Sequence, residues 1–100
     1  MSATMIFLGA SHVGAQNYWE GERLIERASL LRRQMRFAEM APLQEQALAI
    51  FEATLGRDHP KVAKTLDELA FVYTQLGRLT ESMELSKRAV GIVEMAQGPE

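Results

Sequence analysis

The sequence contains no cysteine, and it has only two histidines, His12 and His59. The first absence excludes disulfide bonds, thiolate nucleophiles and the cysteine-based sites that hold zinc, haem or iron–sulfur clusters. Neither histidine has the spacing from another histidine or a carboxylate that is typical of a metal site. We therefore expect no cofactor, no need for an oxidising compartment and a cytoplasmic location.

Catalytic motifs and long apolar runs are also missing. No Gly-x-Ser-x-Gly or His-Glu-x-x-His motif occurs. Gly9 and Gly14 have the spacing of a phosphate-binding loop, but Ala15-Gln16 replaces the essential Lys-Ser/Thr. The apolar opening Met5 to Ala10 has no Lys or Arg before it and is far shorter than the roughly 20 residues that span a bilayer. We expect neither an enzyme nor a membrane partner, and a secretory signal is disfavoured.

Length and composition favour one folded domain. The chain is 47% apolar and 24% charged, a composition that is ordinary for a globular protein. Its 100 residues are too few for two hydrophobic cores. The net charge of −2 hides a basic stretch, because residues 21–36 carry +3 and the remainder carries −5. Arginines in that stretch are one way to contact nucleic-acid phosphates. The acidic chain and the lack of a reading motif disfavour this, so no nucleic-acid partner is expected.

The chain repeats with a period of 42 residues. Sliding residues 37–56 forward by 42 places them on residues 79–98, with six identical positions. The identities are Glu39 with Glu81, Leu43 with Leu85, Ala47 with Ala89, Ile50 with Ile92, Glu52 with Glu94 and Gly56 with Gly98. The preceding segment keeps the same register more weakly, through Leu24 with Leu66 and Ala28 with Ala70. Such a period is typical of stacked structural repeats.

Apolar spacing divides each repeat into two helices, because residues that recur every three to four positions share one helical face. The first helices carry Leu24, Ala28, Leu31 and Met35, then Val62, Leu66, Leu69, Ala70, Tyr73 and Leu76. The second helices carry Phe37, Leu43, Ala47, Ile50 and Phe51, then Leu79, Leu85, Ala89, Ile92 and Val93.

Turn residues separate these helices. Gly56 and Gly77 follow apolar runs, where a left-handed C-terminal cap favours glycine. Asp58 or His59 is expected to cap the next helix, with Pro60 in its first turn. The short linkers require consecutive helices to lie antiparallel. We therefore predict an all-α fold, an antiparallel helix-hairpin solenoid.

Together with the 42-residue period of the chain, two segments resemble the kinesin light chain-like class of tetratricopeptide repeats. They are Leu55-Gly56-Arg57-Asp58-His59-Pro60 and Leu69-Ala70-Phe71-Val72-Tyr73, and the resemblance covers about residues 22–100. It implies a fragment of a right-handed superhelix of helix pairs, in which Ala28, Ala47, Ala70 and Ala89 allow close helix contact. It also implies that the chain holds another polypeptide.

Three features depart from the family pattern. Met35 stands at the turn position that Gly77 fills in the second repeat, so either the turn is altered or left-handed strain is tolerated. Pro42 lies several residues into a predicted helix, where its missing N–H predicts a kink. Asp67-Glu68 and Ile25-Glu26 stand where this class usually has paired asparagines that hold a peptide backbone.

The resemblance divides the chain into residues 1–20 and a repeat domain at residues 21–100. The domain comprises about two repeats, 21–58 and 59–100. Residues 1–20 form either a helix that packs on the array or a mobile tail anchored by Tyr18 and Trp19. Under the 42-residue shift Leu8 falls on Ile50 and Gly14 on Gly56, which favours the helix.

The resemblance further implies a binding groove lined by the first helix of each repeat. We call its ten positions the groove set: Glu22, Ile25, Ser29, Arg32, Arg33, Lys64, Asp67, Phe71, Thr74 and Gln75. Arg32 and Arg33 can fork onto carboxylates, and Phe71 offers an apolar anchor, so a protein or peptide partner is expected. The alternative is a solvated helix face without a ligand.

The last predicted helix is apolar on more than one side, through Met83, Val90, Ile92, Val93 and Met95. Stacked repeats normally need about three units and polar caps, so these residues predict contact with a second copy of the chain. The competing interpretation is a piece of a longer array. We expect an interaction module; the alternatives are a self-associating structural unit and, third, a regulatory appendage of an enzyme encoded elsewhere.

Overall fold

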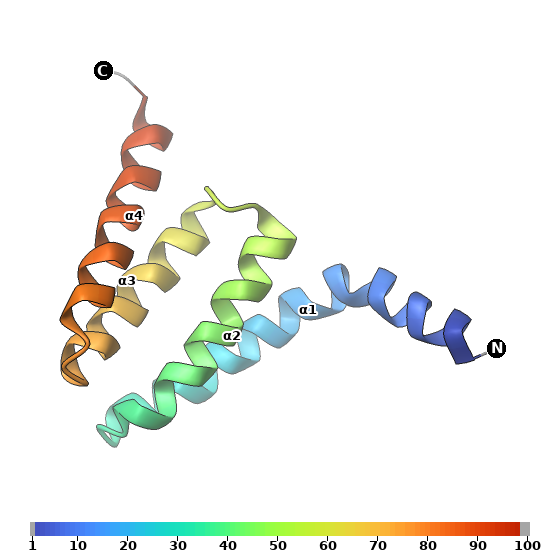
Figure 1. Cartoon of the computed structure of the whole chain (residues 1–100), viewed down its shortest axis with the longest axis horizontal. Coiled ribbons are helices and arrows are strands. Elements are labelled where there is room, and N and C mark those ends of the chain that lie inside the picture. Colours follow the sequence, from blue (N-terminus) through green and yellow to red (C-terminus); the bar gives the residue numbers. More distant parts are fainter. Residues whose placement is uncertain (1, 99–100) are drawn as a thin grey trace.

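The structure is a computed structural model that describes the backbone of residues 2–98 and the side chains of residues 18–98. It contains the α-helices α1 (Ser2–Arg33), α2 (Phe37–Leu55), α3 (Pro60–Gln75) and α4 (Leu79–Gln97), and residues 2–98 include no β-strand. Helices α1 and α2 form one antiparallel hairpin, α3 and α4 form a second, and α2 packs on α3 (Figure 1). The predicted all-α helix-hairpin fold is confirmed.

Helix α1 begins earlier than the first repeat. It runs without a break from Ser2 to Arg33, and its first turns extend beyond α2 (Figure 1). The two interpretations of residues 1–20, a packing helix or a mobile tail, depend on the side chains of residues 1–17, which lie outside the described residues.

The apolar core lies between the helices of each hairpin and where α2 meets α3. All four alanines expected at close helix contacts, Ala28, Ala47, Ala70 and Ala89, are buried. The largest fully buried side chains are Phe51, Met40, Leu66, Leu69, Val62 and Val72. Of the predicted apolar stripes, Met35, Leu76, Leu79 and Val93 are exposed instead. Met35 lies in a turn, and Leu79 and Val93 lie on a face of α4 that no helix among residues 2–98 covers.

The turns inside the two hairpins have the same geometry. Met35 has φ +59°, and Gly77, its equivalent 42 residues later, has φ +82°. The Met35 N–H donates to Arg32 O at 2.9 Å and the Arg36 N–H to Leu31 O at 2.9 Å. The same two bonds recur one repeat later, at 3.1 and 2.8 Å. This pair of bonds is the pattern of a Schellman cap. The turn is therefore unaltered, and the strain at Met35 is tolerated.

The linker between the hairpins has its predicted cap at His59, but Gly56 does not adopt the expected left-handed helical conformation. Gly56 has φ +97° and ψ 151°, a region that is almost exclusive to glycine. His59 is the cap of α3, because its Nδ1 accepts from the Lys61 N–H at 3.0 Å, and Pro60 is the first helical residue. Pro42 lies inside α2 without ending it. Pro42 has no N–H to donate to the Ala38 carbonyl. Both residues are exposed, so water can donate to that carbonyl instead.

Candidate partner-binding surface

The groove set lies on the first helix of each hairpin, with five residues on α1 and five on α3. The ten residues form five pairs that are 42 positions apart in the sequence. The first pair is Glu22 with Lys64 and the last is Arg33 with Gln75. Glu22, Ile25 and Phe71 are half-buried, and the other seven are exposed. Most of the set is therefore accessible to a partner.

One contact joins the two halves of the groove set. The Arg32 guanidinium carbon lies 4.4 Å from the centroid of the Phe71 ring, so a cation of α1 stacks on an aromatic ring of α3. Phe37, at the start of α2, meets the same ring edge-to-face at a centroid distance of 5.8 Å. Arg32 is exposed and Phe71 is half-buried, and a cation over a ring that water still reaches stabilises by about 0.5–1 kcal/mol. This stack places a positive charge and an apolar surface next to each other.

A second contact joins α1 to α3 nearer the start of α3. The Lys61 ammonium lies 2.5 Å from a Glu22 carboxylate oxygen. The hydrogen bond from Lys61 holds the pKa of Glu22 below its usual range, and the same bond raises the pKa of Lys61. Lys61 also lies 5.3 Å from the Phe51 ring centroid and 6.0 Å from that of Tyr18. Glu22 is therefore already neutralised within the molecule.

The remaining charges of the groove set are mainly positive. Among residues 18–98, Arg32, Arg33, Lys64 and Asp67 form no ion pair. The hydroxyls are less available, because that of Ser29 donates to its own helix and that of Thr74 is shared between the Ala70 carbonyl and Ser82. Three unpaired cations against one unpaired carboxylate favour an acidic ligand.

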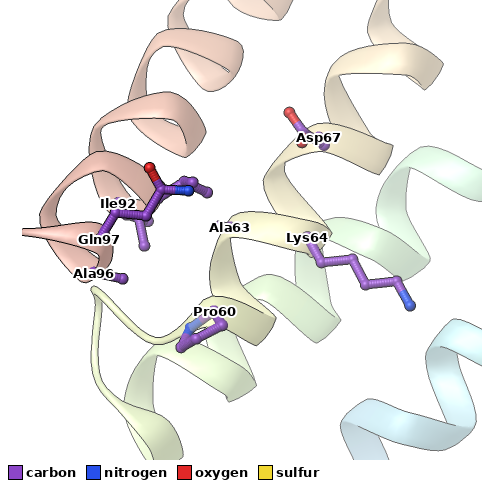
Figure 2. A pocket seen from close by; sticks show the side chains of 8 residues that line it. Pro60, Ala63, Lys64, Asp67, Ile92, Ala96 and Gln97 are labelled. Atoms are coloured by element: carbon purple, nitrogen blue, oxygen red, sulfur yellow. The ribbon is translucent and has the colours of Figure 1, made fainter.

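A hollow of about 450 Å³ lies between α3 and the last turns of α4. Its lining is mostly apolar and consists of Pro60, Ala63, Lys64, Asp67, Ile92, Val93, Ala96 and Gln97. Figure 2 shows Lys64 and Asp67 on α3 and Ile92, Ala96 and Gln97 on α4, with the Lys64 side chain extended away from α4. Two groove-set residues thus also border this hollow.

The residues predicted for self-association do not form one surface. Met83, Val90, Val93 and Met95 are exposed, whereas Ile92 is 4% exposed and packs in the core. Ile92 faces α3, because it belongs to the cluster that contains Val62 and Leu66, and it offers no surface to a second copy. At 100° per residue, Met83, Val90 and Val93 share one side of α4, and Met95 lies on the other.

Within residues 18–98, no three His, Asp or Glu side chains are placed together so that they could hold a metal ion. No helix in the described part of the chain is long and apolar enough to cross a membrane.

Comparison with known families agrees with the repeated hairpin geometry. A sequence profile of the tetratricopeptide repeat matches residues 22–95. This chain belongs to the tetratricopeptide repeat family. Such repeats generally act as scaffolds for protein–protein interaction, and this is the coarse function of the chain. No curated protein matches it.

Sequence reasoning missed several residues that shape this tetratricopeptide surface. Lys61 was not expected beside Glu22, and no local pattern indicates it. A forked pair at each hairpin turn had a visible signal: Arg36 binds Glu39 with two hydrogen bonds of 2.8 and 2.9 Å, and Arg78 binds Glu81 with two of 2.7 and 2.8 Å. The 42-residue shift superimposes both arginines as well as both glutamates.

Proposed function

We propose that this chain is an interaction module that binds an acidic peptide, or an acidic segment of a protein, along the groove set. The stack of Arg32 on Phe71 carries the proposal, because it presents a guanidinium beside an aromatic surface at the junction of the two repeats. Arg33, exposed and adjacent, supplies a second guanidinium that can fork onto a carboxylate. A ligand with carboxylates next to an apolar side chain matches this arrangement.

The 42-residue period and the Leu-Gly-x-Asp-His-Pro run further support placing the chain in the kinesin light chain-like class. Peptide capture then depends on side-chain charge, since Asp67-Glu68 occupies the place of the paired asparagines. Asp67 is exposed and unpaired among residues 18–98, and it would repel a carboxylate brought near it. The acidic part of a ligand therefore belongs at the Arg32–Arg33 end of the groove set.

Peptides selected from a displayed random library on the full chain test this function. The R32A/R33A variant should bind the selected peptides about tenfold more weakly, because two charge-assisted contacts are lost. R23A/R27A is the matched control, since it removes two exposed arginines of α1 that lie outside the groove set. Equal loss in both variants, or no acidic bias among the peptides, would contradict the proposal. F71L probes the apolar anchor while keeping most of its packing against Phe37.

Self-association through α4 is the second candidate. Met83, Val90 and Val93 are exposed on one side of α4, and apolar residues grouped on a helix face commonly mark an interface. Light scattering at tens of micromolar decides it: a dimer mass that falls to a monomer mass in V90E supports self-association, and a monomer mass for the unmodified chain rejects it.

A further inference from the structure

The two hairpins present equivalent faces, and only one of these faces is covered. Met83 of α4 is 64% exposed, whereas its equivalent in α2, Ala41, is 4% exposed. Val93 is 45% exposed, and its equivalent Phe51 is fully buried. The open side of α4, which we call the end face, consists of Leu79, Met83, Val90 and Val93. In the first repeat, α3 supplies the covering helix.

The hollow beside α4 is the continuation of this end face. In the first repeat the equivalent positions are filled, since Ile25, Ile50 and Leu55 pack against the cluster that contains Val62 and Leu66 of α3. The residues 42 positions after those three line the open hollow of about 450 Å³. The hollow thus lies where the first turns of a helix would pack if that helix were placed as α3 is placed on the first hairpin.

Charges at the rims of the covered face show how α3 is held. Glu22 lies 2.5 Å from the Lys61 ammonium at the start of α3, and Glu45 lies 4.0 Å from the Arg78 guanidinium just after its end. Two carboxylates of the first hairpin therefore meet two cations at the ends of the covering helix.

Both rim charges are reversed on the end face. Lys64 and Lys87 occupy the positions 42 residues after Glu22 and Glu45, and neither forms an ion pair within residues 18–98. Meeting a carboxylate takes a rotation of the flexible Lys64 side chain, which extends away from α4 (Figure 2). From the bare apolar face and the two lysines we infer that the end face docks an amphipathic helix of another polypeptide, with a carboxylate near each end of that helix.

A second copy of this chain stacked head to tail is a poorer occupant. In such a stack, α1 of the second copy takes the place that α3 has on the first hairpin. Arg36 of the second copy then stands where Arg78 does and faces Lys87, which brings two cations together. The same stack also places Glu20 where α3 has the fully buried Val62. Glu20 pairs with Arg23 at 3.7 Å on the exposed side of α1, and burying its carboxylate on an apolar face is unfavourable. A helix with carboxylates at both rim positions and an apolar residue at the place of Val62 therefore fits the end face better than a second copy does.

A synthetic peptide with the sequence of residues 58–79 carrying K61E/R78E serves as the probe, with the unmodified peptide as comparator. Anisotropy of the labelled peptides on the full chain gives the affinities. The K61E/R78E peptide should bind about tenfold more tightly, since two exposed pairs change from repulsion to attraction. In a K64E/K87E chain the preference should reverse, which separates charge pairing from any difference in helix content between the peptides.

Two methionines of α4 provide the matched control. M83E should weaken K61E/R78E peptide binding at least about tenfold by placing a charge on the end face, whereas M95E, at an equally exposed methionine on the other side, should not. The inference is wrong if the K64E/K87E chain keeps the preference for the K61E/R78E peptide, or if the two methionine variants have equal effects. A stable dimer of the chain that excludes the peptide would also overturn it. Such a failure leaves the groove proposal standing, because Arg32 and Arg33 lie outside the end face.

Discussion

Replacing Met35 with glycine should stabilise the protein. Met35 holds φ +59° in the turn between α1 and α2, where a side chain with a β-carbon costs about 1–2 kcal/mol. The side chain is 71% exposed, so little buried apolar area is lost with it. Glycine brings a greater loss of chain entropy on folding, about 0.5–1 kcal/mol. The expected net gain is about 0.5–1 kcal/mol, or about 4 °C in Tm for a domain of this size.

The second hairpin supplies the reverse experiment. A β-carbon added at Gly77 would meet no atom within 4 Å. G77M should therefore lower the free energy of unfolding only by the backbone strain, partly offset by the smaller loss of chain entropy on folding. The two changes are then equal and opposite, and M35G/G77M should melt near the unmodified chain. Thermal and urea unfolding followed by circular dichroism measure both. The strain argument is refuted if M35G has a lower Tm than the unmodified chain, or if G77M leaves the Tm unchanged. Q34G, in the same turn, should not stabilise.

Three further predictions concern packing and charge. A47L should destabilise by about 1–3 kcal/mol in urea unfolding, because Ala47 is fully buried at a close helix contact. Lys61 lowers the pKa of Glu22, so this ion pair contributes fully above the ordinary glutamate pKa of about 4.3 and is lost as the pH falls through the lower folded value. The unmodified chain should therefore lose stability faster than E22Q on acidification from about pH 5 to pH 3. Burial and the hydrogen bond to a carboxylate raise the pKa of Tyr73 to about 12, so Y18F, with one remaining tyrosine, should show phenolate absorbance only near that pH.

Matched variants control these measurements. A53L adds the same atoms at an exposed site of α2 and should leave the free energy of unfolding nearly unchanged. E84Q removes a carboxylate that forms no ion pair among residues 18–98, so its acid unfolding should follow that of the unmodified chain. Phenolate absorbance near pH 10 in folded Y18F would contradict the buried environment of Tyr73.

Periodicity made most of the fold predictable. Alanines and leucines that recur after 42 residues indicated helices that approach closely, and all four alanines are buried. Gly77 and Pro60 marked a helix end and a helix start because their backbone preferences are local. The groove positions came from the family resemblance. They stay a prediction, and the sequence does not show which of these residues lie in contact with one another.

The sequence by itself determined the repeat, the four helical segments and the cap at His59, since these depend on residues near each other along the chain. Only the tertiary structure decided that Arg32 stacks on Phe71 and that Lys61 neutralises Glu22, because those contacts join helices whose relative placement depends on packing. It likewise decided that Ile92 is buried while Val93, its neighbour, is open. An apolar stripe shows that a face must be covered, and only the arrangement of all the helices shows which face still lacks its neighbour.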